Sequence, residues 1–382
     1  MKIEFEENQF LFFLSYMLCM IDAILIGYSA FGSIPGIHIV SRIMCVLAFV
    51  TILIKLLADG YYPVKELLIL SVAGMILLIV YLQSGYNHIF YFLIVFLGMR
   101  GVKAEQIIKW DFIIKIILML LIITSALTGI IEHYVTYRTG ESILRYSVGF
   151  NHPNTFAGLV LSLILEEAYL SKRKPNVFYV LVVWIVDVVV YLVSANRTAV
   201  LLIALFPIIL LGISGSDEQL INRHKGGVFV YSYPIMVVIS FVVMKFTQKK
   251  VFITAIDRLF SNRFYNAEVL FSKYGISILG QKVELISVKS ARLLHSSIAL
   301  LDVAFLRILI QGGVLVLFVF CVFYCLACKT AILLNDRWFI GIVFVFMMFG
   351  LFESGSNNVY MNFSILLVIE NLYRNEALMG VE

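Results

Sequence analysis

Long apolar runs separated by short polar stretches follow one another along nearly the whole chain. A membrane-spanning α-helix needs about 17 to 25 mostly apolar residues, whereas a transmembrane β-strand shows about ten residues of alternating character. The runs here are continuous, so the pattern predicts an all-α, polytopic helical membrane protein. About twelve transmembrane helices are expected, at residues 10–31, 37–57, 67–83, 86–99, 112–131, 153–171, 177–194, 197–213, 228–246, 303–328, 338–355 and 359–372.

The fourth and the last run are shorter than a comfortable span, so ten or eleven crossings remain alternatives. The first run is too long for the core of a signal peptide and carries Asp22, so we expect it to stay as an anchor. Asp22 and Asp187 lie deep within runs, where a charge is costly, and they should face the interior of the bundle. Lys115 and Glu166 fall toward the inner ends of helices and are interpreted as interfacial.

One connection is much longer than the others and spans residues 247–302. Amphipathic runs at 264–274 and 285–301 predict short helices that lie on the outer face of the bundle. A separately folded domain is not expected at this size. The organisation is therefore one transmembrane domain, 1–382, with one long extracytoplasmic loop.

Composition supports the membrane class: 62% of the residues are hydrophobic, 14% are charged and the mean hydropathy is +0.99. Soluble domains lie far from these values. The net charge of +5 belongs to the inner loops and does not indicate nucleic acid. No phosphate-binding glycine loop, zinc signature or nucleophile elbow is present, so we expect no metal and no cofactor.

Basic residues set the orientation, because short cytoplasmic loops are enriched in Lys and Arg. Placing both termini in the cytoplasm leaves only Arg138, Arg145 and Arg197 in the short outer loops. The long loop escapes this rule. The inner segments then contain Lys2, Lys55, Lys65, Arg100, Lys103, Lys109, Lys172, Arg173, Lys174, Arg223, Lys225, Lys329, Arg337 and Arg374.

With this topology, almost every unusual polar residue maps to the outer half of the bundle. An outward cluster of arginines indicates an anionic ligand, because a guanidinium group grips phosphate bidentately and stays charged. Each arginine alone could instead reach lipid headgroups. The polar set is Arg138, Arg145, Asn151, His152, Asn154, Arg197, Arg263, His295, Asp302, Arg307, Glu353, Asn357 and Asn358.

The segment His152-Pro153-Asn154 stands where an outer loop becomes the sixth span. Proline is favoured in the first helical turn, and asparagine is a good capping residue, so the segment also reads as a helix start. That account does not explain His152 and Asn151.

Several segments together resemble the Wzy-type bacterial polysaccharide polymerases, which share their architecture with the O-antigen ligases. The family pattern of Arg followed by Gly-Phe-x-His-Pro-Asn-x-x-Gly is similar to Arg145 and residues 149–158. Residues 194–199, Ser-Ala-Asn-Arg-Thr-Ala, resemble a second family segment, with Asn196 in place of Ser. In the long loop, residues 259–263 resemble Leu-Ser-Gly-Arg, with Asn262 in place of Gly, and both tolerate the left-handed region. His295, Asp302 and residues 312–313 match a further pattern more weakly.

The resemblance implies an inverting glycosyltransferase that polymerises polyprenyl-diphosphate-linked oligosaccharide units on the outer face of the bacterial cytoplasmic membrane. The lipid-linked oligosaccharide would be both donor and acceptor, and a chain-length regulator and a flippase of the same pathway are implied partners. Breaking a bond to diphosphate requires stabilisation of negative charge, for which Arg145, Arg197 and Arg263 are the candidates.

A general base is also needed, and arginine cannot serve. His295 is preferred because its ordinary pKa suits neutral pH, with Asp302, Glu353 and His152 as the other available groups. The candidate catalytic residues are His295, Arg145, Arg197, Arg263 and Glu353. The candidate substrate-binding residues are Arg138, Asn151, His152, Asn154, Asp302, Arg307 and Asn357.

Two other functions are kept open. An O-antigen ligase would use similar arginines but hand a finished glycan to another acceptor. A lipid-oligosaccharide flippase would also have many spans and buried acids, but transporters usually place their site near the midplane, whereas the polar residues here gather at the outer rim.

Overall fold

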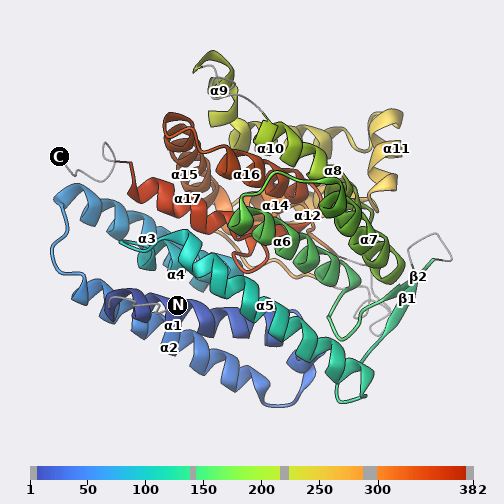
Figure 1. The fold of residues 1–382 in the computed structure, drawn as a ribbon, viewed down its shortest axis with the longest axis horizontal. Coiled ribbons are helices and arrows are strands. Elements are labelled where there is room, and N and C mark those ends of the chain that lie inside the picture. Colours follow the sequence, from blue (N-terminus) through green and yellow to red (C-terminus); the bar gives the residue numbers. More distant parts are fainter. Residues whose placement is uncertain (1–6, 138–142, 216–222, 287–298, 376–382) are drawn as a thin grey trace.

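A computed structural model describes residues 7–137, 143–215, 223–286 and 299–375 (Figure 1). The prediction of an all-α chain is confirmed, since helices make up most of the described structure and the strands form one short hairpin. In order, the α-helices are α1 (Glu7–Ile21), α2 (Ile37–Ala58), α3 (Val64–Ser84), α4 (Asn87–Gly98), α5 (Ala104–Leu127), α6 (Pro153–Ser171), α7 (Val177–Ser194), α8 (Arg197–Gly215), α9 (Arg223–Val230), α10 (Ser232–Phe246), α11 (Val251–Leu259), α12 (Arg263–Tyr274), α14 (Ala304–Arg307), α15 (Gly313–Leu333), α16 (Arg337–Gly350) and α17 (Ser364–Tyr373).

Short π- and 3₁₀-helical turns join some of these helices: η1 (Asp22–Gly27), η2 (Ala30–Ser33), η3 (Ile308–Gly312) and η4 (Ser354–Asn357). Among the described residues, five helical segments are long and apolar enough to cross a membrane: Asn8–Gly27, Ile37–Ala58, Val64–Ser84, Val177–Ser194 and Ala304–Leu333. The chain is therefore a membrane protein. The expectation of about twelve spans is met only in part, because other apolar helices are short. The 12 residues of α4, for example, extend about 18 Å at 1.5 Å per residue.

Two helices form the centre of the bundle and one lies clearly at its edge. In α4 every residue from Ile89 to Gly98 is buried, and eight of the ten residues of α17 are buried. In α2 only Ala48, Ile52 and Lys55 are buried, although the helix is about as apolar as α17. An all-apolar helix is stable either inside a protein core or against lipid, so α2 fits a lipid-facing position.

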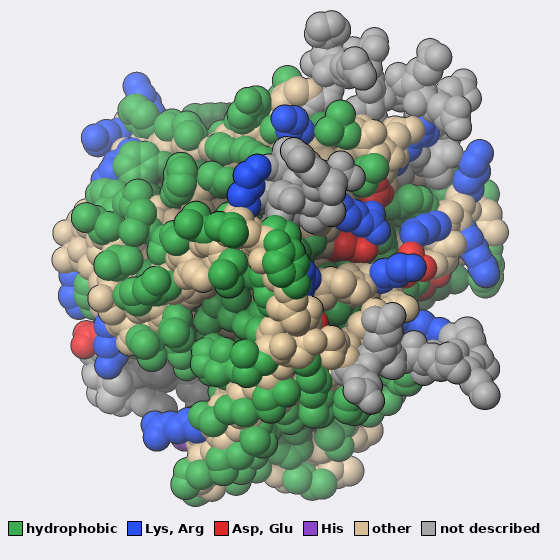
Figure 2. Space-filling model, turned by 90° about the vertical axis from the view of Figure 1, so that its left-hand side faces the viewer, with side chains coloured by type: hydrophobic (Ala, Val, Ile, Leu, Met, Phe, Trp, Pro, Cys, Tyr) green, Lys and Arg blue, Asp and Glu red, His purple; other side chains and the backbone are tan. Residues whose placement is uncertain are grey.

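The bundle has two different ends. In Figure 1 the start of α1 and the end of α17 lie toward the left, whereas α11 and the β-hairpin lie at the right. Figure 2 views the left-hand end, where many Lys and Arg side chains and few carboxylates stand among apolar side chains. One ion pair joins Nε of Arg100 to the carboxylate of Glu66 at 2.8 Å. The guanidinium group of Arg100 also lies over the ring of Tyr62.

The hairpin is the part of the fold that the hydrophobic pattern does not predict. Strand β1 (Val135–Tyr137) pairs antiparallel with β2 (Leu144–Tyr146), which places Arg145 opposite Thr136. Gly149 then turns the chain toward α6 with a φ of +87°. A Cβ atom at Gly149 would lie 2.8 Å from the backbone oxygen of Ile122, so the turn depends on the missing side chain.

The long loop contains two described helices. Helix α12 confirms the prediction for residues 264–274, and α11 was not predicted. The expected helix over 285–301 is wrong at both of its described ends, because Ile286 and Ala299 pair as an antiparallel bridge with hydrogen bonds of 2.8 and 3.1 Å. The rest of that segment, 287–298, lies outside the described residues.

Backbone pairing docks the loop onto an interrupted helix. The backbone N–H of Gln281 donates to the oxygen of Gln311 at 3.0 Å, and that of Val314 donates to the oxygen of Ser277 at 3.0 Å. Gly313, the first residue of α15, has a φ of +85°. The loop thereby satisfies polar groups that the break in the helix would otherwise leave unpaired.

Several charged side chains within the bundle are buried. Asp22 and Asp187 face the interior as predicted, being 3% and 7% exposed, and Asp22 accepts a hydrogen bond from the hydroxyl of Tyr91 at 2.7 Å. The interpretation of Lys115 and Glu166 as interfacial is wrong, because both are fully buried and form an ion pair. The positions of Lys115 along α5 and of Glu166 along α6 do not reveal that the two helices pack together there.

Candidate functional site

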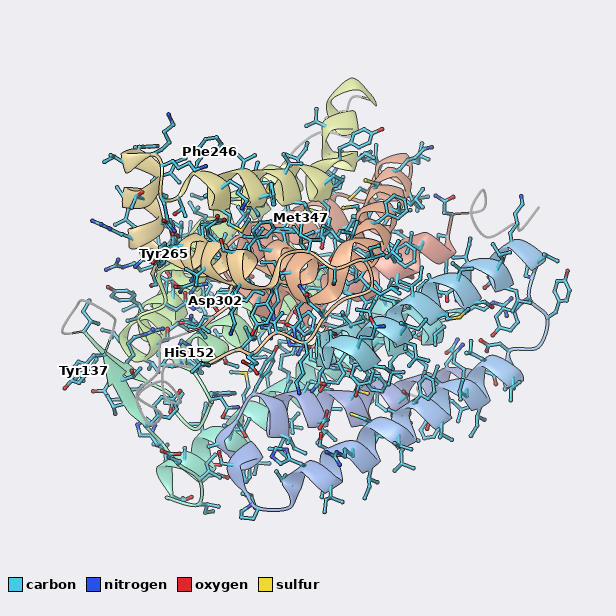
Figure 3. All side chains as sticks on the ribbon, turned by 180° about the vertical axis from the view of Figure 1, so that it is seen from behind. Tyr137, His152, Phe246, Tyr265, Asp302 and Met347 are labelled. Atoms are coloured by element: carbon cyan, nitrogen blue, oxygen red, sulfur yellow. The ribbon has the colours of Figure 1, made fainter. Side chains whose placement is uncertain are left out.

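A cavity of about 200 Å³ opens at the end of the bundle near the hairpin, where Figure 3 labels His152, Asp302 and Tyr265. We call it the first cavity. Its walls come from β2, the start of α6, the junction of α7 and α8, the start of α12 and the segment before α14. It is lined by Arg145, His152, Asn154, Ala195, Asn196, Arg197, Thr198, Phe260, Ser261, Asn262, Arg263, Tyr265, Asn266, Leu300 and Asp302.

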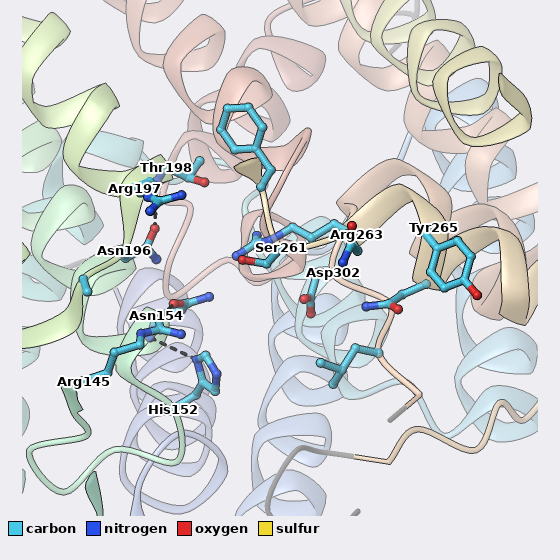
Figure 4. A pocket seen from close by; sticks show the side chains of 15 residues that line it. Arg145, His152, Asn154, Asn196, Arg197, Thr198, Ser261, Arg263, Tyr265 and Asp302 are labelled. Atoms are coloured by element: carbon cyan, nitrogen blue, oxygen red, sulfur yellow. Dashed lines mark hydrogen bonds between the residues drawn. The ribbon is translucent and has the colours of Figure 1, made fainter. Parts of the chain in front are cut away.

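Arg145 is held in place by two neighbouring elements. Its Nε donates to the backbone oxygen of Ser194 at 2.8 Å, and its Nη2 donates to Oδ1 of Asn154. These bonds link the hairpin to the end of α7 and the start of α6. The guanidinium group therefore reaches the cavity from a strand that is braced by two helices (Figure 4).

His152 caps the N-terminus of α6. Its Nδ1 accepts the backbone N–H of Asn154 at 3.1 Å, and Pro153 occupies the first helical position as predicted. The prediction of Asn154 as the capping residue is wrong, because its side chain bonds to Arg145 and Glu353 instead. Burial, together with the charges of Arg145 and Arg263, lowers the pKa of His152 to about 3. The ring is therefore neutral at neutral pH, and Nε2 carries the proton.

Arg197 begins α8 and reaches the long loop. Its Nη1 donates to the backbone oxygen of Leu259 at 3.4 Å. The preceding residue, Asn196, accepts the backbone N–H groups of Thr198 and Ala199 with its Oδ1, at 3.0 and 3.1 Å. The Asn196 side chain thus satisfies N–H groups that the start of a helix leaves unpaired, which fixes the direction of α8.

Arg263 enters the cavity from the first residue of α12. Asn262 has a φ of +56°, which confirms that this position uses the left-handed region. The carboxylate of Asp257 accepts the backbone N–H groups of Phe264 and Tyr265 at 3.0 and 2.9 Å. Asp257 therefore anchors the turn that presents Arg263, although it lies outside the cavity.

Glu353 gathers three donors on one oxygen. Its Oε1 accepts Nη2 of Arg263 at 2.7 Å, Nδ2 of Asn154 at 2.9 Å and Nδ2 of Asn196 at 3.1 Å. Arg263 and Glu353 are only 6% and 8% exposed. Nε and Nη1 of Arg263 have no hydrogen-bond partner in the described part of the chain. Two buried donors therefore remain for a ligand.

A second cavity of about 360 Å³ adjoins the first and shares His152, Asn154, Leu300 and Asp302 with it. Its character is different, because aromatic rings and amides make up much of its wall. The remaining lining residues are Tyr28, His88, Asn151, Thr155, Arg307, Phe349, Glu353, Ser354, Gly355 and Met361.

Asp302 stands between the two cavities on the segment that leads into α14. Within the described residues, its carboxylate forms no hydrogen bond and no ion pair. Burial raises the pKa of Asp302 above its ordinary value; Arg263 and Arg307 oppose this shift, and Glu353 adds to it. In Figure 4 Asp302 lies beside Arg263, across the cavity from Arg145 and His152.

Most of the residues that the sequence singles out come together here. Asn357 does not, because its buried amide bonds to the backbone oxygen of Ala304 at 2.8 Å and to the hydroxyl of Tyr86, and it lines neither cavity. Arg138 and His295 lie outside the described residues, so their roles stay predictions. The first cavity contains Arg145, His152, Asn154, Arg197, Arg263 and Asp302, and the second adds Asn151, Arg307 and Glu353.

Several lining residues were not predicted. Tyr28 and His88 lie at the predicted outer ends of the first and fourth spans, so the topology already placed them on the correct side. Asn196 was noticed only as a departure from a motif. The Tyr265 and Asn266 side chains reach the cavity because the chain turns at Asn262, just before α12 begins. Apart from Asn262, the sequence carries no signal for that turn.

Comparisons of the chain with protein-family models, with curated proteins and with solved structures find no match. What the protein does must therefore be inferred from the chemistry of the two cavities. Among the described residues, no group of three His, Cys, Asp or Glu side chains could hold a metal ion. The main chemical feature of the site is the fixed positive charge of Arg145, Arg197 and Arg263.

Proposed function

We propose that the protein is a membrane glycosyltransferase of the Wzy type, which joins polyprenyl-diphosphate-linked oligosaccharide units into a surface polysaccharide. The observation that carries the proposal is the guanidinium group of Arg263. Two of its nitrogens are buried without a partner among the described residues, in a cavity that Arg145 and Arg197 also line. Three arginines around one cavity favour a ligand with concentrated negative charge, such as a diphosphate.

The proposed reaction needs mainly fixed positive charge from the wall of the first cavity. As the bond between the sugar and the diphosphate breaks, negative charge grows on the leaving oxygen, and fixed donors stabilise it without rearranging. Arg145 and Arg263 are fixed by their contacts with Ser194 and Glu353. The neutral imidazole of His152, on the same side of the cavity as Arg145, adds an N–H donor. Removal of one such donor typically lowers the rate about a hundred- to a thousandfold.

The proposed location follows from the two ends of the bundle. We place the chain in the bacterial cytoplasmic membrane, with about twelve spans and both termini in the cytoplasm. The cavities lie at the end of the bundle near the hairpin (Figure 3), away from the start of α1 and the end of α17 (Figure 1), and would then face outward. Lipid-linked oligosaccharides delivered by a flippase would reach them from the outer leaflet, and a chain-length regulator would act on the product.

The test uses cells that lack the protein. We expect them to accumulate single lipid-linked repeat units, and the wild-type gene to restore polymer. A gene carrying Arg263→Lys should not restore it, because lysine is a single point donor. Arg258→Lys is the matched control, since Arg258 is exposed in the same loop and lines neither cavity. Normal chain lengths in the deletion strain would refute the proposal.

The same strain separates the two alternatives. A ligase predicts full-length polymer that stays on its lipid carrier while the final acceptor remains uncapped. A flippase predicts that repeat units no longer reach the outer leaflet. Arg145→Lys should abolish polymer while outward transport of the repeat unit continues, and loss of that transport would favour the flippase.

A further inference from the structure

The wall between the two cavities is where any transfer between them must occur. A sugar that passes from a donor to an acceptor has one carbon that faces the leaving group and the attacking hydroxyl together. If the donor and the acceptor occupy separate cavities, this carbon lies at the shared wall. Among the residues that the structure describes, only His152, Asn154, Leu300 and Asp302 line both cavities.

The second cavity suits an uncharged sugar better than a diphosphate. Its arginine, Arg307, already donates through Nε to Oε1 of Gln311 at 3.2 Å and through Nη1 to Oγ of Ser354 at 2.9 Å. The same guanidinium group lies 4.6 Å from the ring centre of Tyr86. Arg263 in the first cavity, by contrast, keeps two buried nitrogens without a partner in the described structure.

The remaining wall of the second cavity offers ring faces and amides. The rings of Tyr28 and His88 lie edge to face, with centres 6.4 Å apart. Sugars present C–H faces that pack on such rings, and hydroxyl groups that bond to amide oxygens such as that of the Asn151 side chain. The geometry fits the terminal sugar of an oligosaccharide.

We infer that the second cavity binds the acceptor sugar and that Asp302 is the catalytic base that removes the proton from its attacking hydroxyl group. This inference rests on the proposed transferase function. It assigns the base to a residue of the described structure, at the junction of the two cavities.

The other titratable groups near the wall between the two cavities are not suited to serve as the base. His152 uses Nδ1 as the helix cap, and its pKa of about 3 makes it a poor base at neutral pH. Glu353 is bound by Arg263, Asn154 and Asn196 through one oxygen. The carboxylate of Asp302 has no such commitment in the described part of the chain.

The charges that face Asp302 come from several elements. Arg263 on α12 and Arg307 on α14 favour its ionised form, whereas Glu353 after α16 and burial favour its neutral form. The imidazole of His152 on the opposite side is neutral. The net result is a carboxyl group with a raised pKa, which is a stronger base than an exposed aspartate once ionised.

The bond changes are balanced without another reagent. The acceptor oxygen forms a bond to the anomeric carbon of the donor while its proton passes to Asp302. The bond from that carbon to the diphosphate oxygen breaks, and the electron pair leaves with the diphosphate. The configuration at the anomeric carbon inverts. Asp302 later releases the proton to water.

The test uses the full-length protein in vesicles, with the lipid-linked repeat unit isolated from cells that lack it. Asp302→Asn should lower chain extension by a hundred- to ten-thousandfold, the usual contribution of a general base. Binding of undecaprenyl diphosphate should be unchanged or tighter, because a nearby negative charge is lost. Asp302→Glu should recover part of the activity, with a shifted acid limb in its pH–rate profile.

The second variant probes the acceptor side. Tyr28→Ala should raise the concentration of repeat unit needed for half-maximal extension of a preformed lipid-linked polymer, with the maximal rate within about tenfold and undecaprenyl diphosphate binding unchanged. Arg197→Lys should weaken undecaprenyl diphosphate binding instead. Equal effects of both variants on donor and acceptor would overturn the division between the cavities.

The outcomes separate this inference from the proposed function. If the wild-type protein extends chains and Asp302→Asn does so within tenfold, the assignment of the base is wrong while the transferase function stands. The assignment is also wrong if Asp302→Asn loses undecaprenyl diphosphate binding along with activity, since that indicates a structural role. If the wild-type protein neither binds undecaprenyl diphosphate nor extends chains, the proposed function itself fails.

Discussion

His152 combines a structural and a chemical task in one ring. Nδ1 accepts the backbone N–H of Asn154 and so starts α6, which leaves the Nε2–H group to act in the cavities. Capping fixes the tautomer, and the fixed tautomer makes His152 a donor. A residue used as a cap in this way cannot also serve as the base, which is consistent with the assignment of that role to Asp302.

Replacement of His152 should separate the two tasks. His152→Ala loses the cap and should destabilise the protein by about 0.5–2 kcal/mol, whereas His152→Asn keeps a capping oxygen and should unfold close to wild type. Both should lose activity. Thermal unfolding in detergent, read beside chain extension, checks this, and full activity in His152→Asn would contradict the role of the ring as a donor.

The same residue should make stability depend on pH. Its pKa is about 3 in the folded protein against an ordinary value of 6.5, so between these values the unfolded chain binds a proton that the folded chain does not. Stability therefore falls as the pH falls from 6.5 toward 3. The unfolding temperature of His152→Asn should drop less between pH 7 and pH 5 than that of wild type.

Gly149 provides a second test at the residue scale. Gly149→Ala should destabilise the protein by more than the roughly 1–2 kcal/mol that a left-handed backbone costs other residues, because its Cβ would also lie 2.8 Å from the oxygen of Ile122. Gly129→Ala is the matched control, with a φ of +77° and nothing within 4 Å of the added atom. Equal unfolding temperatures for the two variants would rule out the close approach.

At the residue scale, the sequence identifies chemistry better than contacts. Arg145 and Arg197 could be picked out because arginines are rare in the short outer loops of a membrane protein, and Arg263 because residues 259–263 resemble a family segment. The role of Asn154 could not, since it bonds to Glu353, 199 positions away in the chain. Such partners become visible only when the helices are packed.

At the scale of elements, Glu353 is the point where four parts of the chain meet. Its Oε1 connects the segment after α16 to α6 through Asn154, to the start of α8 through Asn196 and to α12 through Arg263. The long loop is thus tied to the bundle through a buried ion pair. The position of Arg263 in the cavity depends on this joint.

Disruption of the joint should be costly and non-additive. Removal of one partner from a buried ion pair typically destabilises a protein by about 3–5 kcal/mol, because the other charge remains buried. We expect Glu353→Gln and Arg263→Met each to lower the unfolding temperature strongly. The double variant should be more stable than the sum of the single effects implies. Additive losses would show that the two side chains do not act as a pair.

Helix α11 should lie in the membrane interface beside the first cavity. Val251, Phe252 and Leu259 are 89%, 76% and 58% exposed and share one face, and Lys249 and Lys250 precede them. An exposed apolar face next to basic residues is typical of helices that lie at the level of lipid headgroups.

This placement can be measured by fluorescence quenching. The tryptophan added by Phe252→Trp should be quenched by lipids brominated near the headgroup, relative to wild type. The tryptophan added by Tyr265→Trp, which lines the first cavity, should instead be quenched by aqueous iodide. Iodide quenching of both residues would remove α11 from the membrane.

The elements themselves were predictable to different degrees. Long continuous apolar runs predicted α2, α3, α7 and α15, because a helix that crosses a membrane needs such a run. The hairpin has only three residues in each strand, too few to show a pattern. The segment 285–301 has helical amphipathicity, yet its described ends pair with each other, which shows that tertiary pairing overrides a local period.

At the scale of the whole molecule, the two ends of the bundle differ in the side chains that they present. Basic side chains stand at the end viewed in Figure 2, which holds the start of α1 and the end of α17, and the cavity residues labelled in Figure 3 lie toward the opposite end. Lys and Arg in short loops favour the cytoplasmic side. In the orientation proposed above, the arginine-lined cavity would face outward.

This orientation can be tested with single cysteines. In a variant without the five native cysteines, Tyr137→Cys at the hairpin should react with a membrane-impermeant maleimide in intact cells, because Tyr137 is 57% exposed at the cavity end. Lys103→Cys, exposed just before α5, should react only after the membrane is opened. The reverse pattern would put the cavities in the cytoplasm, where a polymerase fed by a flippase could not use them. Labelling of both sites in intact cells would contradict the separation of the two ends by a membrane.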